Sequence, residues 1–235
     1  MQQVLLAFFM ILLTVVVYYA MTKLYKRYSY SYLLPILTTT VLIIIILVIL
    51  NIPYKNYLIG GQWINSLLGP AVVALAYPLY KQRHFLMNYL FTIVGGVLIA
   101  TISGMVSVGL LAKILGINYT LILSIIPKSL TTPVAIEVAK GLGGNASIAI
   151  FSVVIAGIFG AIAAPTIFKF MRVHSPIGRG IALGSASHSM GTSKAAEYSE
   201  LTFSMSSVAM ALCAIIGTFL GPIVVWLFHF LETLI

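Results

Sequence analysis

Long apolar runs separated by short polar gaps dominate this chain. A helix needs roughly 20 apolar residues to cross a hydrocarbon core of about 30 Å. Runs of about this length lie at 3 to 22, 33 to 50, 62 to 80, 88 to 112, 145 to 168 and 203 to 230. The pattern therefore predicts an all-α polytopic membrane protein with about six full transmembrane helices.

Two polar stretches interrupt the second half of the chain, and they resemble each other. Residues 128 to 137 and 188 to 197 place the same residue types at four aligned positions: Ser129/Ser189, Thr132/Thr192, Ala135/Ala195 and Glu137/Glu197. Each stretch also has a basic or titratable side chain just before the shared Ser, Lys128 in one and His188 in the other. A polar insert that occurs twice in an apolar chain indicates a functional site.

The basic residues between the runs indicate how the inserts cross the membrane. Three gaps are rich in Lys and Arg and should face the cytoplasm: Lys23, Lys26 and Arg27; Lys81 and Arg83; Lys169, Arg172 and Arg179. All three face inward only if the region of about 117 to 143 enters the membrane and returns to the side it came from. We therefore expect a re-entrant hairpin there, with Pro127 and Pro133 separating two arms of about 14 Å each.

The same reasoning predicts a second hairpin at about 180 to 201, broken at Gly184 to Gly191 and entering from the cytoplasmic side. The spans after the hairpins share Gly160/Gly217 and Pro165/Pro222 at an offset of 57. Hairpin plus span would thus form an inverted repeat, a common origin of transporter sites. We expect scaffold helices over residues 1–116 and a transport-type domain over residues 117–235, built from repeats 117–171 and 177–231. The alternative is eight spans, two of them discontinuous.

Composition supports the membrane assignment and excludes other classes. Hydrophobic residues make up 61% of the chain and charged residues 7%, against about 25% charged in soluble domains. The net charge of +9 comes from residues in the gaps, which argues against a nucleic-acid partner. Cys213 is the single cysteine, no metal-ligand spacing occurs, and the chain has neither a G-x-S-x-G motif nor any Asp. We expect no catalytic residues, metal or cofactor.

The inserts carry groups that suit a small anion. We expect a helix to begin after each tip, with Thr132 and Thr192 as N-caps, so that two helix N-termini face a shared cavity at the membrane midplane. Free N–H groups and about half a positive charge at each terminus attract anions. The predicted substrate-binding residues are Lys128, Ser129, Thr131, Thr132, His188, Ser189, Gly191, Thr192 and Lys194. The competing interpretation is that these hydroxyls only satisfy broken backbone.

Three titratable residues of the inserts have more than one interpretation. Glu137 and Glu197 could form ion pairs within their helices, with Lys140 and Lys194 three residues away, or could couple protons if desolvated. His188 lies at the predicted second tip and could donate to a carboxylate, gate by protonation or serve structure alone.

These residues resemble the LrgB/CidB family of bacterial membrane proteins. The resemblance covers almost the whole chain and rests on Lys128-Ser129-Leu130-Thr131-Thr132-Pro133, Gly143-Gly144, the Gly157 to Pro165 run, Ala186-Ser187-His188 with Gly191-Thr192, Ile52-Pro53-Tyr54, Gly60-Gly61 and Ala76-Tyr77-Pro78-Leu79-Tyr80. This chain departs at Ser189, where many members look to have Ala or Gly, and at Ser193-Lys194, where Ala followed by a basic residue is usual.

The resemblance implies a multi-pass protein of the bacterial plasma membrane that is linked to murein hydrolase activity and cell lysis. It also implies a small LrgA/CidA-like membrane partner and relatives that transport pyruvate, glycolate or glycerate. We also expect a homo-oligomer. We therefore expect a carrier for a small monocarboxylate that works by alternating access. The alternative is a holin/antiholin-like pore or regulatory protein without carrier activity.

Overall fold

A computed structural model describes residues 2–28, 33, 35–67, 70, 73–74, 76–81 and 83–233, and the statements below concern these residues. Every regular element among them is a helix. Four helices are long and apolar enough to cross a membrane, and they are α1, α7, α10 and α12. The described chain is therefore all-α and multi-pass, as the hydrophobic pattern predicts.

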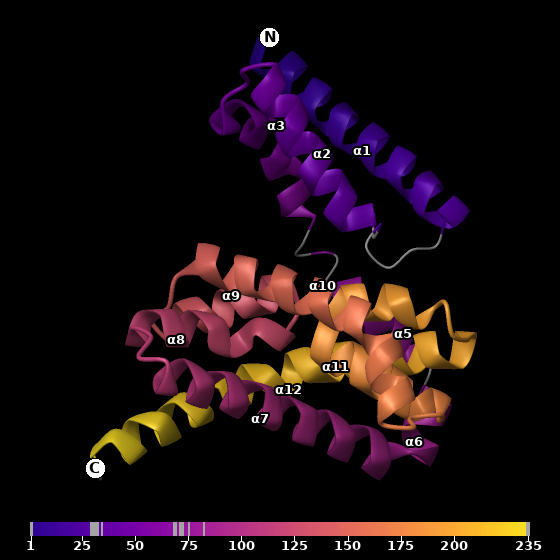
Figure 1. The fold of residues 1–235 in the computed structure, drawn as a ribbon, viewed down its shortest axis with the longest axis vertical. Helices are drawn as coiled ribbons and strands as arrows, with labels where there is room; N and C mark the ends of the chain where they lie inside the picture. Colours follow the sequence, from indigo (N-terminus) through magenta and orange to yellow (C-terminus); the bar gives the residue numbers. More distant parts are fainter. Residues whose placement is uncertain are drawn as a thin grey trace. The chain divides into compact units, whose positions relative to one another are not determined.

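The chain forms two compact units, residues 1–73 and 74–235. In the first unit, α1 (Gln2–Tyr28) packs against α2 (Pro35–Ile49) and α3 (Tyr54–Ser66) (Figure 1). Gly60 allows the close approach of α3 to α1, because a Cβ added there would lie 2.7 Å from Ala7 O and 2.8 Å from Met10 Cβ. The boundary between the units lies at 73/74, whereas the predicted division into scaffold and transport domain lies at 116/117.

The predicted span at 62 to 80 is not one helix. Helix α3 starts earlier, at Tyr54, and ends at Ser66, and a separate helix α5 covers Ala76–Lys81. Residues 68, 69, 71, 72 and 75 of this predicted span lie outside the described residues. Helix α2 has 15 residues, fewer than the 18 that the predicted run at 33 to 50 contains.

The second unit has three long helices with shorter helices between them. Their order is α5 (Ala76–Lys81), α6 (Arg83–Asn88), α7 (Leu90–Ile114), α8 (Tyr119–Ile125), the 3-10 turn η2 (Ile126–Ser129), α9 (Thr132–Gly141), α10 (Ala146–Phe170), α11 (Pro176–Ala195) and α12 (Glu200–Thr233). Helices α7 and α12 lie side by side (Figure 1). Thr101 meets Cys213 and Gly109 lies against Phe228, so these two helices run parallel.

Two segments of the second unit fold back on themselves. At the first, Asn145 N donates to Ser124 Oγ at 2.7 Å, so the chain after α9 returns to α8. At the second, the Arg179 guanidinium lies 5.1 Å from the centre of the Tyr198 ring, so the chain after α11 returns to the start of α11. We call these segments hairpin 1 (residues 119–141) and hairpin 2 (residues 176–195).

Candidate functional site

The tip of hairpin 1 is formed where prolines prevent a continuous helix. Pro127 has φ −81° and ψ 17°, outside the helical range, and the chain makes a 3-10 turn over Ile126–Ser129 before α9 begins. Lys128 lies in this turn half-buried, with its Nζ 3.4 Å from Ser129 Oγ. Among the described residues, no carboxylate forms a salt bridge with Lys128. The tip therefore presents an ammonium group that no acidic side chain in this part of the chain neutralises.

The helix after this tip starts one residue earlier than predicted. Thr131, not Thr132, is the N-cap of α9, and Pro133 lies in the first turn, where its missing N–H costs nothing. The Thr131 side chain makes no capping hydrogen bond, and its buried Oγ1 has no partner. A buried hydroxyl without a partner costs free energy of about 1–3 kcal/mol, so an arriving hydrogen-bonding group would be stabilised here.

The tip of hairpin 2 is His188, where the backbone leaves the helical conformation. Its φ of 43° and ψ of −130° break α11 into two arms, 176–187 and 189–195. We predicted Thr192 as the N-cap of the second arm, but it lies inside that arm. Its Oγ1 donates to His188 O at 3.0 Å and also lies 3.0 Å from Ser206 Oγ. The prediction was wrong because alignment with hairpin 1 placed the helix start four residues too late.

The imidazole of His188 is buried and fixed by a backbone carbonyl. Its Nε2 lies 2.9 Å from Val153 O. A carbonyl only accepts hydrogen bonds, so Nε2 carries the proton and Nδ1 is the acceptor in the neutral ring. Nδ1 lies 3.4 Å from Ser189 Oγ. The ring can offer Nδ1–H to an anion only after it takes up a second proton.

Both tips lie against glycines near the midpoints of the long helices. A Cβ added at Gly104 of α7 would lie 3.3 Å from Ser129 Oγ, and one added at Gly217 of α12 would overlap Leu130. On α10, a Cβ at Gly157 would lie 2.6 Å from His188 Cε1, and one at Gly160 would overlap Ser187. The aligned glycines Gly160 and Gly217 thus each receive the tip of the other repeat's hairpin.

The tip of hairpin 1 contacts the broken helix that carries the tip of hairpin 2. The turn η2 packs against α11 as well as against α7, α10 and α12. Eight of the nine predicted binding residues lie in or directly after these tips: Lys128, Ser129, Thr131, Thr132, His188, Ser189, Gly191 and Thr192. Lys194 lies farther along the second arm, buried, with its Nζ 2.5 Å from Glu197 Oε2.

Both expected ion pairs are present. Lys140 Nζ lies 3.0 Å from Glu137 Oε1 on the exposed face of α9, and Lys194 pairs with Glu197 at the end of hairpin 2. The pairing supports a structural role for the two carboxylates.

Buried polar side chains behind the tips were not among the predicted residues. Thr101 and Cys213 are 1% exposed, Ser185 is 1% exposed, and Ser206 is fully buried. A signal for them exists in the sequence, because polar residues inside an apolar transmembrane run face the protein interior. Thr101, Ser206 and Cys213 were missed because the apolar runs that contain them were assigned to packing alone, whereas Ser185 lies in the second insert but outside its aligned positions.

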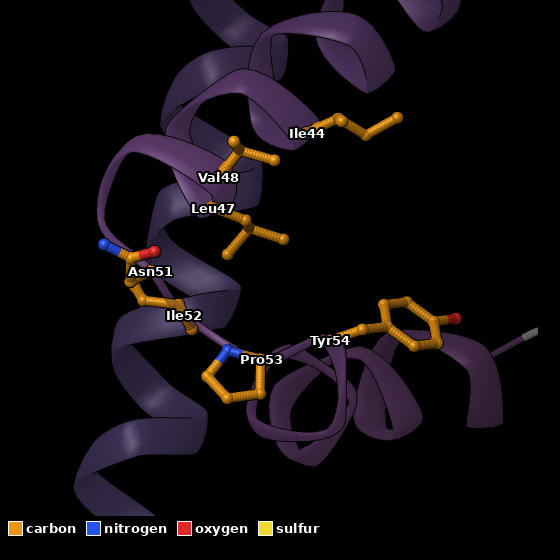
Figure 2. Close-up of a pocket in the computed structure, with 7 residues that line it drawn as sticks. All are labelled: Ile44, Leu47, Val48, Asn51, Ile52, Pro53 and Tyr54. Atoms are coloured by element: carbon orange, nitrogen blue, oxygen red, sulfur yellow. The ribbon is translucent and has the colours of Figure 1, made fainter.

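A separate hollow of about 460 Å³ lies in the first unit (Figure 2). The side chains of Ile44, Leu47 and Val48 on α2 and the ring of Tyr54 at the start of α3 border it. Asn51, Ile52 and Pro53 complete its lining. The lining carries no charged side chain, so we place the anion-binding groups at the hairpin tips.

Known proteins resemble this chain over nearly its whole length. The chain is 57% identical to the uncharacterized protein YxaC of Bacillus subtilis (strain 168) over 97% of this chain and all of the relative. It is 37% identical to the holin-like protein CidB of Staphylococcus aureus (strain Mu50), covering 95% of this chain and 97% of the relative. The uncharacterized protein YwbG of B. subtilis is 35% identical over 89% of this chain and 93% of the relative.

No solved structure matches. Neither the family description nor the relatives' names mention a catalytic activity. The long apolar helices and these bacterial relatives make the chain a multi-pass protein of a bacterial cell membrane. The model of the LrgB-like family matches residues 14–227, and the chain belongs to that family.

Proposed function

We propose that this protein is a carrier for a small monocarboxylate, with the binding site between the tips of hairpins 1 and 2. The observation that carries the proposal is the position of Lys128. Lys128 lies in the turn directly before α9, whose first N–H groups lack a side-chain cap, and no described carboxylate pairs with its ammonium. Placing a Lys at the centre of a membrane costs about 2.5–3.5 kcal/mol or more, and a substrate carboxylate would offset that cost.

The hydroxyl and imidazole groups around Lys128 complete the proposed site. Thr131 Oγ1 is buried without a partner, and Ser129 Oγ lies within 3.4 Å of the ammonium. From the other tip, His188 would donate Nδ1–H to the carboxylate once protonated, since Nε2 is held by Val153. Because Lys194 is paired with Glu197, we propose that it stabilises hairpin 2 and does not contact the substrate directly.

Alternating access would follow from the two hairpins entering from opposite sides. The base of hairpin 1 lies near the end of α7 and the start of α10, and the base of hairpin 2 lies near the end of α10 and the start of α12. No arm is longer than half of a long helix, and both tips contact glycines near helix midpoints. We propose half-membrane, re-entrant hairpins on these grounds, arranged as the inverted repeat 117–171 and 177–231. Helix α7 contacts η2, α11 and α12, so we propose that α7 moves together with the two hairpins during transport.

The alternative function is a holin-like pore or a regulator of cell lysis, and the name of the S. aureus relative favours it. In that case the inserts would shape a channel or a surface for a small LrgA/CidA-like partner. We include that partner and a homo-oligomer in the proposal. Both functions are therefore to be tested with and without the small partner.

Uptake by reconstituted protein distinguishes the two functions. A carrier takes up labelled pyruvate into proteoliposomes saturably, and Lys128→Ala or His188→Ala lowers the rate at least tenfold. Lys140→Ala is the matched control, because it removes a positive charge from hairpin 1 at an exposed residue already paired with Glu137. Its uptake should equal that of the wild type.

Two results would contradict the proposed carrier function. One is uptake no faster than in empty vesicles, with and without the small partner. The other is leakage of an unrelated solute such as glucose at the same rate as pyruvate, which is the behaviour of a pore.

A further inference from the structure

A basic segment without an acidic partner joins α10 to α11. It contains Lys169, Arg172 and Arg179, which we call the basic patch. Neither of the salt bridges among the described residues involves any of these three cations. Glu200, in the first turn of α12, pairs with none of them. The charge of the basic patch is therefore available to an anionic partner.

Arg172 occupies a position where the backbone favours glycine, with a φ of 54°. Arg172 N donates to Lys169 O at 3.3 Å, and Val173 N donates to Phe168 O at 2.9 Å. These two hydrogen bonds form the helix end that usually has glycine at this position, because glycine adopts a left-handed conformation without strain. The strain at Arg172 indicates that its guanidinium has a role that glycine could not fill.

Arg179 holds its guanidinium in a fixed direction close to Arg172. Its Nε donates to Val173 O at 2.8 Å. The group lies 5.8 Å from the ring centre of Phe168 and 5.1 Å from that of Tyr198. In the described part of the chain, its two Nη groups make no hydrogen bond. A fixed guanidinium with free N–H donors is suited to the oxygens of a phosphate group.

The basic patch lies at the level of lipid headgroups. Helix α10 has 25 residues and rises about 37 Å, more than a hydrocarbon core of about 30 Å, so its end reaches the headgroup region. Two apolar side chains at this end are exposed, Phe170 by 85% and Met171 by 65%. Apolar side chains next to cations are typical of a membrane interface, where the first contact acyl chains and the second contact headgroups.

We propose that the basic patch binds the headgroup of an anionic phospholipid of the phosphatidylglycerol class. The guanidinium groups of Arg172 and Arg179 and the ammonium of Lys169 bind the phosphate, while Phe170 and Met171 contact the acyl chains. A zwitterionic lipid fits less well, because it brings its own cation beside the three cations of the patch. The bound lipid joins the end of α10 to the start of α11, and its binding does not depend on the proposed carrier function.

Thermal unfolding of the purified protein in a neutral detergent tests the site. Dioctanoyl-phosphatidylglycerol is compared with dioctanoyl-phosphatidylcholine at constant ionic strength. The unfolding midpoint of the wild type should rise saturably with the anionic lipid, because a ligand that binds only the folded state stabilises it. It should rise little with the zwitterionic lipid. Arg172→Gly should raise the lipid concentration at half effect roughly fivefold, and the double variant with Lys169→Gln about 25-fold.

Arg172→Gly separates loss of lipid binding from loss of folding. Glycine relieves the strain at this φ, so the variant without lipid should be at least as stable as the wild type. Lys140→Gln is the matched control, because it removes an equal charge from an exposed lysine of hairpin 1, which precedes the opposite end of α10. Its response to the anionic lipid should equal that of the wild type.

Three results would overturn the lipid site. The first is an equal response of the wild type to the two lipids. The second is an equal loss of the response in Arg172→Gly and Lys140→Gln, which would show non-specific attraction of a basic protein to a charged micelle. The third is the same rise of the midpoint with inorganic phosphate alone, which would show a site for a free anion.

Discussion

At the scale of single residues, the backbone of His188 is the most unusual feature of the proposed site. A non-glycine residue at φ 43° and ψ −130° costs free energy on the order of 1–3 kcal/mol, which neighbouring contacts must offset. Those contacts are the hydrogen bond from Nε2 to Val153 O and the packing of the imidazole ring against Gly157. The conformation of the tip therefore depends on α10.

Gly157→Ala tests this dependence. The added Cβ would lie 2.6 Å from His188 Cε1 and 2.8 Å from Met190 Sδ, so the ring or the tip must move. We expect the free energy of unfolding to fall by about 1–3 kcal/mol, as for overpacked cores. Gly95→Ala is the control, since nothing lies within 4 Å of a Cβ there and Ala favours the helix by about 1 kcal/mol. Equal stability of the two variants in thermal unfolding would contradict the role of Gly157.

At the scale of elements, Arg179 joins the base of hairpin 2 to α10. Its Nε donates to Val173 O at 2.8 Å, and its guanidinium lies 5.8 Å from the Phe168 ring centre and 5.1 Å from that of Tyr198. The two rings pack edge to face, with their centres 5.9 Å apart. These contacts hold the end of α10, the start of α11 and the connection to α12 together.

The stability of this base should depend on alkaline pH through Tyr198. Burial raises the pKa of the Tyr198 hydroxyl above its ordinary value of 10.0, and the nearby Arg179 charge only partly opposes this. Because the pKa is higher in the folded state, the stabilising contribution is complete below about pH 10 and is lost as pH rises through the folded-state pKa. Thermal unfolding of the wild type and Tyr198→Phe should differ by a constant below about pH 10, and the wild type should lose stability relative to the variant above it. Parallel curves up to pH 12 would show that Tyr198 does not titrate with folding.

The sequence predicts most elements of the second unit well, for identifiable reasons. The predicted runs at 88 to 112 and 145 to 168 match α7 and α10 to within about two residues at each end, because apolar residues fill both helices and Asn145 caps the start of α10. Pro127 places the tip of hairpin 1 correctly, since proline removes a backbone donor at a fixed point. No proline marks the tip at His188. The sequence therefore predicted only that the helix breaks somewhere within Gly184 to Gly191, and the prediction of Thr192 as N-cap was wrong.

The contacts between elements could not be read from the sequence. Nothing in the local pattern shows that Gly157 receives His188 or that Thr101 meets Cys213, because these pairs are separated by 31 and 112 residues and depend on how helices pack. The prediction of a single helix over the run at 62 to 80 was wrong for a different reason. Its apolar composition satisfies a span, but Tyr54 to Ser66 already form a helix whose Gly60 packs on α1.

At the scale of the whole molecule, the two hairpins determine the topology in the membrane. The end of α7 and the start of α10 lie on the same side if hairpin 1 returns, and on opposite sides if it crosses. One contact favours return: Asn145 N donates to Ser124 Oγ, which brings the start of α10 back to α8.

Single cysteines at Ile114, Ser147 and Phe170 test this topology in intact cells with a membrane-impermeant maleimide. All three positions are exposed, and the native Cys213 is 1% exposed, so the unsubstituted chain is the background control. With the re-entrant hairpin and the basic loops inside, Ile114→Cys and Ser147→Cys should both label from outside. Phe170→Cys should label only after permeabilisation. Labelling of positions 114 and 170 from outside, with position 147 protected, would instead establish a full crossing, and the two tips would then no longer enter the membrane from opposite sides.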